Sequence, residues 1–579
     1  MPLRLFFALT LAGLCLSAAA TAANPLVVVT GSGPVRGFSA HGVREFRAIP
    51  YAASTAGEQR WTPPVPPAPW VAVRDATQFQ PGCPQVVRFA VTEASDNEDC
   101  LHLNIAIPES AAAQHAALPV LIWMHGGAWV GGSNDLYPLD FLAQHSGVIV
   151  VAINYRLGVF GFMPHPAFDA ATNGGLAFED QRLAFRWVQQ NIAAFGGNPH
   201  NVTIAGESAG AASVCLQLAT PERARGLFQR GIIQSAGCTT PLRTVAEGEV
   251  MGLQLAQDVG CADPTTALAC LRRVPLPPLL AAQTALAARV GRAFSPSVGS
   301  LALPRDGTTA FSHGQFVRVP LLNGGTRDEM RLYVGYDVIG GSPVTTDNYL
   351  AKLSALYGAQ APAIAARYPP SHYSSPASAL GTVMSDYLPG AGLNNCLFLH
   401  TATLASRYVP VYQYEFTDQA APPVMPDPGF ELGAVHSSEL PYQFPRFTNK
   451  RVFDGPELAT GSARLAKQMA AYWGAFARSG KPTVAGLPAW HRFRSDAAVL
   501  RLDPSHVVEY DAGQAHQCRF WARLYPPARV RSRTWTKGAR PVTDKPLAPP
   551  PPKPHSPRTA LTVPASRPWP IAPPPCRQR

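Results

Sequence analysis

The chain has 579 residues, of which 46% are hydrophobic and only 15% charged, and its mean hydropathy is +0.00. This composition excludes a disordered or solvating protein. The formal net charge of +11 is concentrated at one end: residues 526–579 hold eleven Lys and Arg against one acid, Asp544, and the other residues hold 37 Lys and Arg against 36 Asp and Glu. A nearly neutral body does not indicate a nucleic-acid partner.

The N-terminus has the layout of a secretory signal peptide. Arg4 precedes an apolar run at residues 5–16, and small residues follow through Ala23. Because the apolar run is short for a membrane span, we expect residues 1–23 to be removed, together with Cys15, from a secreted or periplasmic protein. An N-terminal membrane anchor is the alternative, and no other segment is long and apolar enough to span a membrane.

The body of the protein, residues 24–525, alternates short apolar runs with segments of helical periodicity. Strands are predicted at residues 118–124, 148–154, 202–205, 319–323 and 409–416, and helices at residues 180–192 and 457–478. Runs that are apolar throughout suit a sheet buried on both faces. Strands interleaved with helices therefore predict an α/β protein with a mostly parallel sheet.

A G-x-S-x-G pattern, residues 206–210, stands between the predicted strand at 202–205 and a helix that opens on small residues. A serine on such a sharp turn has a strained backbone, and the residues two before and two after it cannot carry bulk that would clash between strand and helix. The pattern by itself is also typical of plain turns. This strand-turn-helix setting indicates that Ser208 is a nucleophile.

The predicted strand at 118–124 ends in the sequence His-Gly-Gly-Ala-Trp, residues 125–129. Small residues here leave backbone N–H groups free to point into a pocket, as a tetrahedral oxyanion requires. A plain Gly-rich turn is the alternative. This sequence stands one strand-helix unit before the serine turn, and this position favours an oxyanion hole. We assign the donors of the oxyanion hole to the N–H groups of Gly127, Ala128 and Ala209.

A serine nucleophile needs a general base, and the base needs a carboxylate that orients it. Eight histidines follow Ser208, and His436 is the one that a loop delivers after the late predicted strand at 409–416. The predicted strand at 319–323 leads into Asp328 and Glu329. Adjacent residues point in different directions, so one of the two carboxylates faces the base, and the residues alone do not choose between them.

Together these motifs resemble the type-B carboxylesterases, a family that includes cholinesterases, para-nitrobenzyl esterases and the non-catalytic neuroligins. The resemblance runs from about residue 26 to residue 525 and is carried by FRAIPYA (46–52), EDCLHLNIAIP (98–108), HGGAW (125–129), NGGLAFEDQRLAFRW (173–187) and residues 195–210, 234–237 and 472–482. It implies an α/β-hydrolase fold, a large mostly parallel sheet flanked by helices, with insertions that form an active-site gorge.

The resemblance also implies roles for individual residues. It assigns the acid to Glu329, with Asp328 as the alternative. It further implies that Ser235 and Glu439 orient His436 and Glu329 by hydrogen bonds. Ala128 stands where the commoner form of the family has a third glycine, and we expect its methyl group to restrict bulky substrates.

Ten cysteines in an exported chain suggest disulfides. The resemblance implies three bridges: Cys83 with Cys100, Cys261 with Cys270, and Cys396 with Cys518. We interpret Cys215 and Cys238 as buried free thiols, with a bridge between them as the alternative, and Cys576 is left over in the tail. No C-x-x-C or H-E-x-x-H spacing indicates a zinc site.

These observations predict a serine carboxylesterase that hydrolyses uncharged small-molecule esters and needs no cofactor. Cholinesterases hold a quaternary ammonium with a Trp in the first disulfide loop, whereas residues 84–99 contain Phe89 as their one aromatic residue, which disfavours choline esters. The alternatives are a neuroligin-like binding protein without catalysis, or a more specialised hydrolase of lipids or xenobiotic esters.

The C-terminal segment, residues 526–579, differs from the rest of the chain. Sixteen of its 54 residues are Pro, and it shows no hydrophobic periodicity, which predicts a disordered or polyproline-like tail. One hypothesis is that its basic charge binds anionic surfaces. Another is that the tail is a product of read-through or out-of-frame translation.

Overall fold

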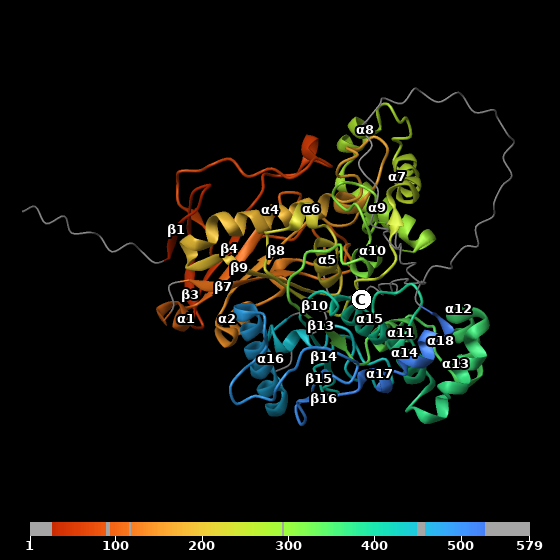
Figure 1. Ribbon diagram of the computed structural model, residues 1–579. Coiled ribbons are helices and arrows are strands. Elements are labelled where there is room, and N and C mark those ends of the chain that lie inside the picture. Colours follow the sequence, from red (N-terminus) through yellow and green to blue (C-terminus); the bar gives the residue numbers. More distant parts are fainter. Residues whose placement is uncertain (1–25, 88–92, 115–116, 292–293, 448–457, 527–579) are drawn as a thin grey trace, which may run out of the picture.

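The computed structural model describes residues 26–87, 93–114, 117–291, 294–447 and 458–526 (Figure 1). The predicted leader, residues 1–23, and the tail beyond Pro526 lie outside the described residues, so these two predictions stay predictions. Within the described ranges, no helix is both long enough and apolar enough to cross a membrane.

One large sheet forms the centre of the molecule. Its eleven strands are β3 (Phe38–Ala40), β4 (Val43–Pro50), β6 (His102–Pro108), β7 (Leu118–Met124), β8 (Ile149–Ile153), β9 (Gly197–Glu207), β10 (Arg230–Gln234), β13 (Leu321–Thr326), β14 (Val411–Phe416), β15 (Val499–Leu502) and β16 (Val508–Tyr510). Their spatial order is β16-β15-β14-β13-β10-β9-β7-β8-β6-β4-β3. The seven strands from β15 to β8 are parallel, and the outer strands at both edges are antiparallel. This confirms the predicted mostly parallel sheet.

Two smaller sheets lie outside the central one. They contain β1 (Val27–Val29), β2 (Pro34–Arg36) and β5 (Arg74–Asp75), and β11 (Arg243–Thr244) and β12 (Ser297–Val298). Neither supplies a residue to the predicted site, so the central sheet alone positions that site.

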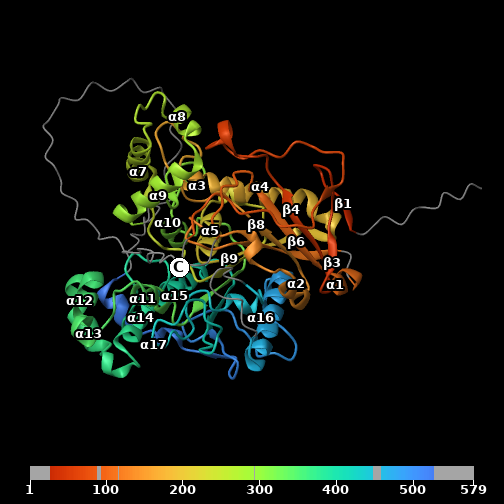
Figure 2. The same ribbon diagram turned by 180° about the vertical axis from the view of Figure 1, so that it is seen from behind.

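Helices cover both faces of the central sheet (Figures 1 and 2). One face packs against α2 (Asp140–Ser146) and α16 (Thr460–Ser479), and the other against α4 (Leu176–Asn191), α5 (Ala209–Leu218) and α15 (Asn395–Ala405). The remaining α-helices of the described residues are α1 (Glu109–Gln114), α3 (Gly158–Phe162), α6 (Pro221–Ala224), α7 (Val245–Asp258), α8 (Ala267–Arg273), α9 (Leu276–Val290), α10 (Gly307–Ser312), α11 (Arg331–Ile339), α12 (Thr346–Tyr357), α13 (Ala361–Arg367), α14 (Pro376–Asp386), α17 (Ala512–Ala515) and α18 (Cys518–Leu524). In both views α7, α8 and α9 form one group at one end of the molecule, and α11 to α14 form a second group, which Figure 1 shows together with α18.

The strands are apolar because each one contributes to two buried layers. On β7, Ile122 and Met124 belong to the layer under α4 and α5, whereas Leu121 and Trp123 belong to the layer under α2 and α16. Successive strand side chains point to opposite faces, and both faces are covered here. The absence of polar alternation in the sequence is thereby explained.

Two predicted elements are longer than their hydrophobic pattern indicated. β9 begins at Gly197 instead of Val202, because Gly197 already pairs with Leu118 of β7, ahead of an irregularity in the register. α4 begins at Leu176 instead of Asp180, and its first turn is buried, including the side chain of Glu179. In both cases backbone pairing or tertiary packing extends an element that the local pattern leaves short.

Four disulfides join the described cysteines. Three are the pairs that the resemblance implied, Cys83–Cys100, Cys261–Cys270 and Cys396–Cys518. The fourth, Cys215–Cys238, corrects the interpretation of these residues as free thiols. Cys215 lies on α5, directly after β9, and Cys238 follows β10. Since β9 and β10 are neighbouring strands, the segments that follow them bring the two Cα atoms within 5.0 Å.

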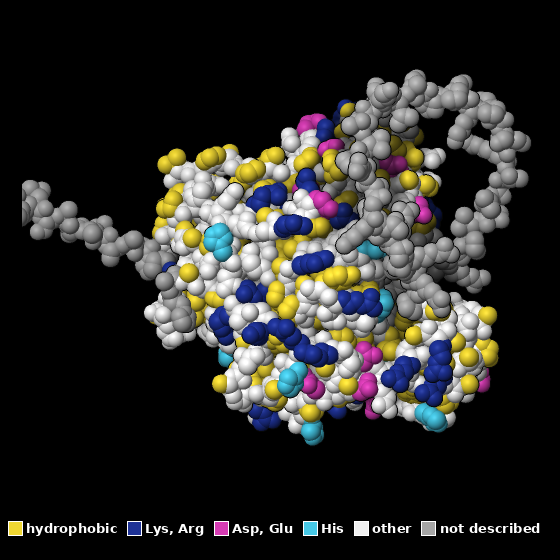
Figure 3. Space-filling model, viewed as in Figure 1, with side chains coloured by type: hydrophobic (Ala, Val, Ile, Leu, Met, Phe, Trp, Pro, Cys, Tyr) yellow, Lys and Arg dark blue, Asp and Glu magenta, His cyan; other side chains and the backbone are white. Residues whose placement is uncertain are grey.

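The body of the protein exposes more basic than acidic side chains on the face that Figure 3 shows. Lys and Arg side chains are spread across this face from α4 and α6 to α16, with few acidic side chains among them. Several carboxylates are buried instead, including those of Asp180, Asp386 and Glu415. A body of nearly neutral composition therefore still presents a positive surface on this side.

Candidate active site

Ser208 lies on a sharp turn between β9 and α5. Its backbone angles, φ 57° and ψ −123°, fall in a region that side-chain-bearing residues rarely adopt. A Cβ atom on Gly206 would come within 2.5 Å of the carbonyl carbon of Gly210, and a Cβ atom on Gly210 would collide with the carbonyl oxygen of Met124. Glycine on both sides of Ser208 is therefore a steric requirement of this turn.

The side chains of Ser208, His436 and Glu329 form a continuous chain of hydrogen bonds. His436 Nε2 lies 2.9 Å from Ser208 Oγ, and His436 Nδ1 lies 2.6 Å from Glu329 Oε2. The three residues follow β9, β14 and β13, all at the carboxyl edge of the sheet, where parallel α/β sheets place their sites. The imidazole and the carboxylate are buried, whereas Ser208 is half-buried.

The two adjacent carboxylates at the end of β13 point to different partners. Glu329 faces His436, and its other oxygen accepts the N–H of Thr326 at 2.9 Å. Asp328 faces away and pairs with Arg331 at 3.2 Å and with Arg327 at 3.4 Å. The geometry therefore selects Glu329 as the partner of His436, as the resemblance implied.

Glu207 is a site residue that the sequence reasoning missed. Its Oε1 atom lies 3.2 Å from His436 Nε2 and accepts a hydrogen bond from Ser437 Oγ at 2.8 Å. The residue is 2% exposed. The signal available in the sequence was an acidic residue directly before the serine, at a position where the turn buries side chains.

The carboxylates around His436 set its protonation. Burial by itself would lower the pKa of His436, but the negative charges of Glu207 and Glu329 outweigh burial and raise this pKa to about 9. Burial has the opposite effect on a carboxyl group, and it raises the pKa of Glu207. Burial, together with repulsion from Glu207 and Glu329, raises the pKa of Glu439 well above its ordinary value. Glu439 therefore favours its neutral form, and His436 binds a proton readily.

The hydrogen bonds expected from Ser235 and Glu439 to His436 and Glu329 are not formed. Ser235 Oγ and both carboxyl oxygens of Glu439 are buried and have no hydrogen-bond partner among the described residues. The backbone of Ser235, at φ 57°, donates its N–H to Gly324 O at 2.7 Å. Position in the chain identified the neighbourhood of these residues but not the direction of their side chains.

The loop after β7 lies against the serine turn. A Cβ atom on Gly126 would come within 3.2 Å of Ser208 Cβ. Gly127 and Ala128 have positive φ angles of 102° and 55°. Ala209 is the first residue of α5, so its N–H has no partner within the helix. The three predicted oxyanion-hole residues therefore lie on two segments that meet at Ser208.

Contacts on both sides hold this loop in place. The ring of Tyr155 stacks on that of His125 at 4.4 Å, and its hydroxyl donates to His125 O at 2.7 Å. Trp129 Nε1 donates to Ser213 Oγ on α5 at 3.0 Å. The loop is thus fixed to the same helix that follows Ser208.

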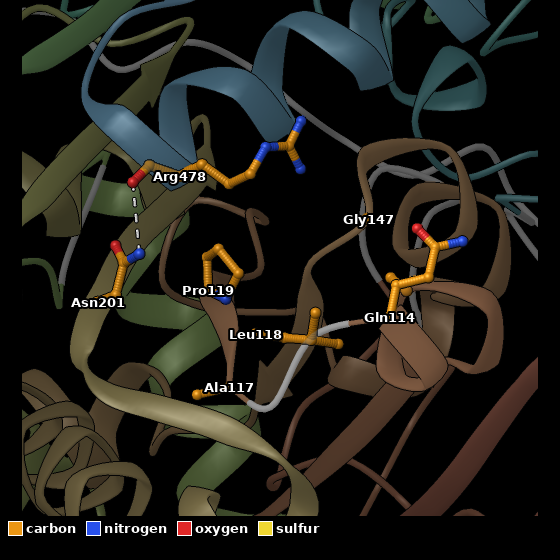
Figure 4. Close-up of a pocket in the computed structure, with 8 residues that line it drawn as sticks. Gln114, Ala117, Leu118, Pro119, Gly147, Asn201 and Arg478 are labelled. Carbon is orange, nitrogen blue, oxygen red and sulfur yellow. Dashed lines mark hydrogen bonds between the residues drawn. The ribbon is translucent and has the colours of Figure 1, made fainter.

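A surface hollow of about 500 Å³ lies elsewhere, beside the amino ends of β7 and β9 (Figure 4). Leu118, Pro119, Asn201 and Arg478 are among its lining residues, and Asn201 donates a hydrogen bond to the carbonyl oxygen of Arg478. Ser208 follows the carboxyl end of β9, so the hollow is at the opposite edge of the sheet. In the ranges that the structure describes, no group of three or more His, Cys, Asp or Glu side chains could hold a metal ion.

The serine lies on a turn between a strand and a helix, and the carboxylate and then the histidine follow it along the chain. In space the histidine lies between the serine and the carboxylate and is hydrogen-bonded to both. This chain order and this geometry define an α/β-hydrolase. A model of the carboxylesterase family matches residues 24–521, and the chain belongs to this family. The protein is a carboxylic ester hydrolase.

Characterised relatives agree with this assignment. The chain is 34% identical to fumonisin B1 esterase of Sphingopyxis macrogoltabida, over 83% of this chain and 87% of the relative. It is 32% identical to para-nitrobenzyl esterase of Bacillus subtilis (84% and 96%) and 31% identical to cocaine esterase of Homo sapiens (85% and 89%). A solved structure of a thermophilic PNB esterase matches with a TM-score of 0.71 and 30% identity, over 86% of this chain and 100% of that one.

Proposed function

We propose that the protein hydrolyses esters through a covalent acyl-enzyme on Ser208, with His436 as general base and Glu329 as its orienting acid. The observation that carries this proposal is the unbroken chain of hydrogen bonds from Ser208 Oγ through His436 to Glu329. Glu329 holds the imidazole so that Nε2 faces the hydroxyl and stabilises the imidazolium that forms.

In the first step Ser208 Oγ attacks the ester carbonyl carbon while His436 Nε2 takes the hydroxyl proton. The carbonyl electron pair moves onto oxygen, where the N–H groups of Gly127, Ala128 and Ala209 stabilise it. The intermediate then collapses: the alcohol oxygen leaves with the proton from His436, and the acyl group stays on Ser208. In the second step water gives a proton to His436 and attacks the acyl carbon. The bond from this carbon to Ser208 Oγ then breaks, Ser208 Oγ takes the proton back from His436, and the carboxylic acid leaves.

We infer that the substrates are uncharged esters. Two buried carboxyl groups, Glu207 and Glu329, contact His436, and a negatively charged acyl group would be repelled at this point. The names of the relatives cover chemically diverse esters, from para-nitrobenzyl esters to cocaine and fumonisin B1, so they leave the acyl and alcohol groups open.

The test uses p-nitrophenyl butyrate and p-nitrophenyl hydrogen succinate, which differ in the charge of the acyl group. We expect the neutral ester to have the higher kcat/KM and Ser208→Ala to lower its turnover by about 10⁴-fold or more. Ser354→Ala on α12, an exposed serine that bonds only its own helix, is the matched control with unchanged turnover. Full turnover by Ser208→Ala would contradict the proposal, and a wild-type protein without activity on any ester would favour the binding-protein alternative.

We also propose that the protein is exported. Four disulfides in the described part of the chain suit an oxidising compartment, and the sequence predicts a leader at residues 1–23. Intact-mass measurement of the mature protein tests the cleavage site and shows whether residues 526–579 are present. Binding to an anionic resin, with and without this tail, tests its predicted affinity for anionic surfaces.

A further inference from the structure

The loop that carries His436 is held by the residue next to Glu329. The backbone N–H of Asp328 donates to Ala434 O at 2.8 Å, and Asp328 Oδ2 accepts the N–H of Ala434 at 3.1 Å. Gly433, with φ 71°, packs on the same carboxylate, since a Cβ atom there would collide with Asp328 Oδ2. One buried carboxylate therefore contacts two successive backbone positions just before His436.

Arg331 contacts Asp328 and a further backbone position of the same loop. Its Nη2 atom lies 3.2 Å from Asp328 Oδ1 and donates to Thr382 Oγ1 on α14 at 2.9 Å, while Nη1 donates to Glu431 O at 3.4 Å. The side chains of Asp328 and Arg331 are 3% and 11% exposed. A pair this deeply buried is weakly screened by solvent, so removal of Asp328 deprives the Arg331 guanidinium of its carboxylate, whereas removal of Arg331 leaves Asp328 paired with the more exposed Arg327.

We propose that Asp328, supported by Arg331, is a positioning residue for ester hydrolysis: it fixes the backbone at residues 433–434 and so keeps His436 in line between Ser208 and Glu329. The adjacent residues Asp328 and Glu329 then have different roles. Glu329 holds the imidazole ring through Nδ1, and its carbonyl accepts the His436 N–H at 3.3 Å, whereas Asp328 holds the chain that leads into His436. This inference rests on the proposed function of Ser208, His436 and Glu329.

The test compares Asp328→Ala, Asp328→Asn and a control, Glu98→Ala, on p-nitrophenyl butyrate. Asparagine keeps an acceptor for the Ala434 N–H. Glu98 forms a comparably buried pair with Arg60 at 2.6 Å, and Arg60 donates to the carbonyl oxygens of Arg272 and Val274 at the end of α8, not to the His436 loop. Because a misplacement of about 1 Å costs about 100-fold in rate, we expect Asp328→Ala to lower kcat about 100-fold with KM within about twofold. We expect Asp328→Asn to recover most of this loss, and Glu98→Ala to lower Tm without lowering kcat.

The pH profile separates positioning from a change in the charge at His436. The pKa of His436 is raised mainly by the charges of Glu207 and Glu329, and Asp328 is not among the groups that raise it, so the acid limb of kcat/KM should stay in place in Asp328→Ala. A shift of that limb overturns the proposal. Three other results would also overturn it. The first is a kcat of Asp328→Ala within about threefold of wild type, and the second is an Asp328→Asn variant no more active than Asp328→Ala. The third is a loss of kcat in Glu98→Ala equal to that in Asp328→Ala.

A second variant keeps the test decisive if Asp328→Ala does not fold. Arg331→Met leaves the bonds between Asp328 and Ala434 but removes the contact with Glu431. Because only some of the contacts that hold the loop are lost, we expect kcat to fall about tenfold at unchanged KM. Wild-type kcat in Arg331→Met overturns the proposal. Retained turnover in Ser208→Ala would instead contradict the proposed function, whatever the Asp328 variants show.

Discussion

Glu207 and Glu329 lie on opposite sides of the His436 imidazole, each close to one ring nitrogen. Only Glu329 contacts the nitrogen that faces away from Ser208, so only Glu329 can set the tautomer. Glu207 lies at Nε2, beside the Ser208 hydroxyl, and acts on the charge of the ring. The two carboxylates therefore have separable effects on the reaction.

At the residue scale, Glu207→Gln should move the acid limb of kcat/KM to lower pH. The negative charge of Glu207 raises the pKa of His436, so its loss lowers that pKa, and the neutral base is then available at lower pH. Glutamine keeps an acceptor for Ser437 Oγ, which preserves the loop contact. A pH profile of kcat/KM on p-nitrophenyl butyrate measures the shift, and an acid limb that stays in place or moves upward would show that Glu207 does not act on His436.

At the scale of elements, the disulfide between Cys215 and Cys238 ties α5 to the segment after β10. It closes a loop with a sequence separation of 23, which predicts a contribution of about 3 kcal/mol through the entropy of the unfolded chain. The double variant Cys215→Ala, Cys238→Ala should lose about this free energy of unfolding in urea. Alkylation of the denatured, unreduced protein supplies the control, because two labelled thiols at these positions would contradict the bridge.

A second set of contacts joins the last helix to the body of the protein. His516, just before α18, lies between Asp386 on α14, at 2.6 Å, and Glu415 on β14, with which it also forms a hydrogen bond. Tyr368 bonds to Asp386 and Tyr510 to Glu415. Burial would lower the pKa of His516, but Glu415 and Asp386 outweigh it and raise the pKa to about 10.

This cluster makes stability depend on pH in a definite direction. The folded pKa of His516 is raised from 6.5 to about 10, so its contribution is complete below pH 6.5 and is lost as the pH rises to about 10. Burial would raise the pKa of Glu415, but His516 lowers it below 4.5, so the contribution of Glu415 is lost in acid. We expect His516→Gln to reduce the fall of Tm between pH 7 and pH 10, and an unchanged fall would exclude His516 as its cause.

At the scale of the whole molecule, α18 is the last helix that the structure describes, and it packs on the body of the protein. Trp521 on this helix is 1% exposed, and its Nε1 donates to Tyr368 Oη at 2.9 Å, while Cys518 is bridged to Cys396. A chain truncated after Tyr525 should therefore keep its kcat and Tm, whereas truncation after Gln517 should lower Tm strongly, because it exposes the surface that Trp521 covers. Equal Tm values for the two truncated chains would show that α18 is not part of the stable body.

Much of the fold was predictable because the relevant signals are local. The apolar strand at 118–124 was predicted at its observed bounds, and the turn around Ser208 was recognisable because glycine is sterically required on both sides. The pairing partners of Cys215 and Cys238 were not predictable in this way, because only the adjacency of β9 and β10 brings them together.

The sequence by itself determined the class of fold, the serine turn, and the loops from which the oxyanion donors, the acid and the histidine come. These follow from short-range sterics and from the hydrophobic pattern of buried strands. Only the tertiary structure decided which side chains meet: Glu329 on His436, Asp328 on the loop before it, and Glu207 on the other ring nitrogen. Glu329 and His436 are 107 residues apart and Ser208 and His436 228 apart. Contacts at such separations depend on strand order and side-chain direction, which no local pattern encodes.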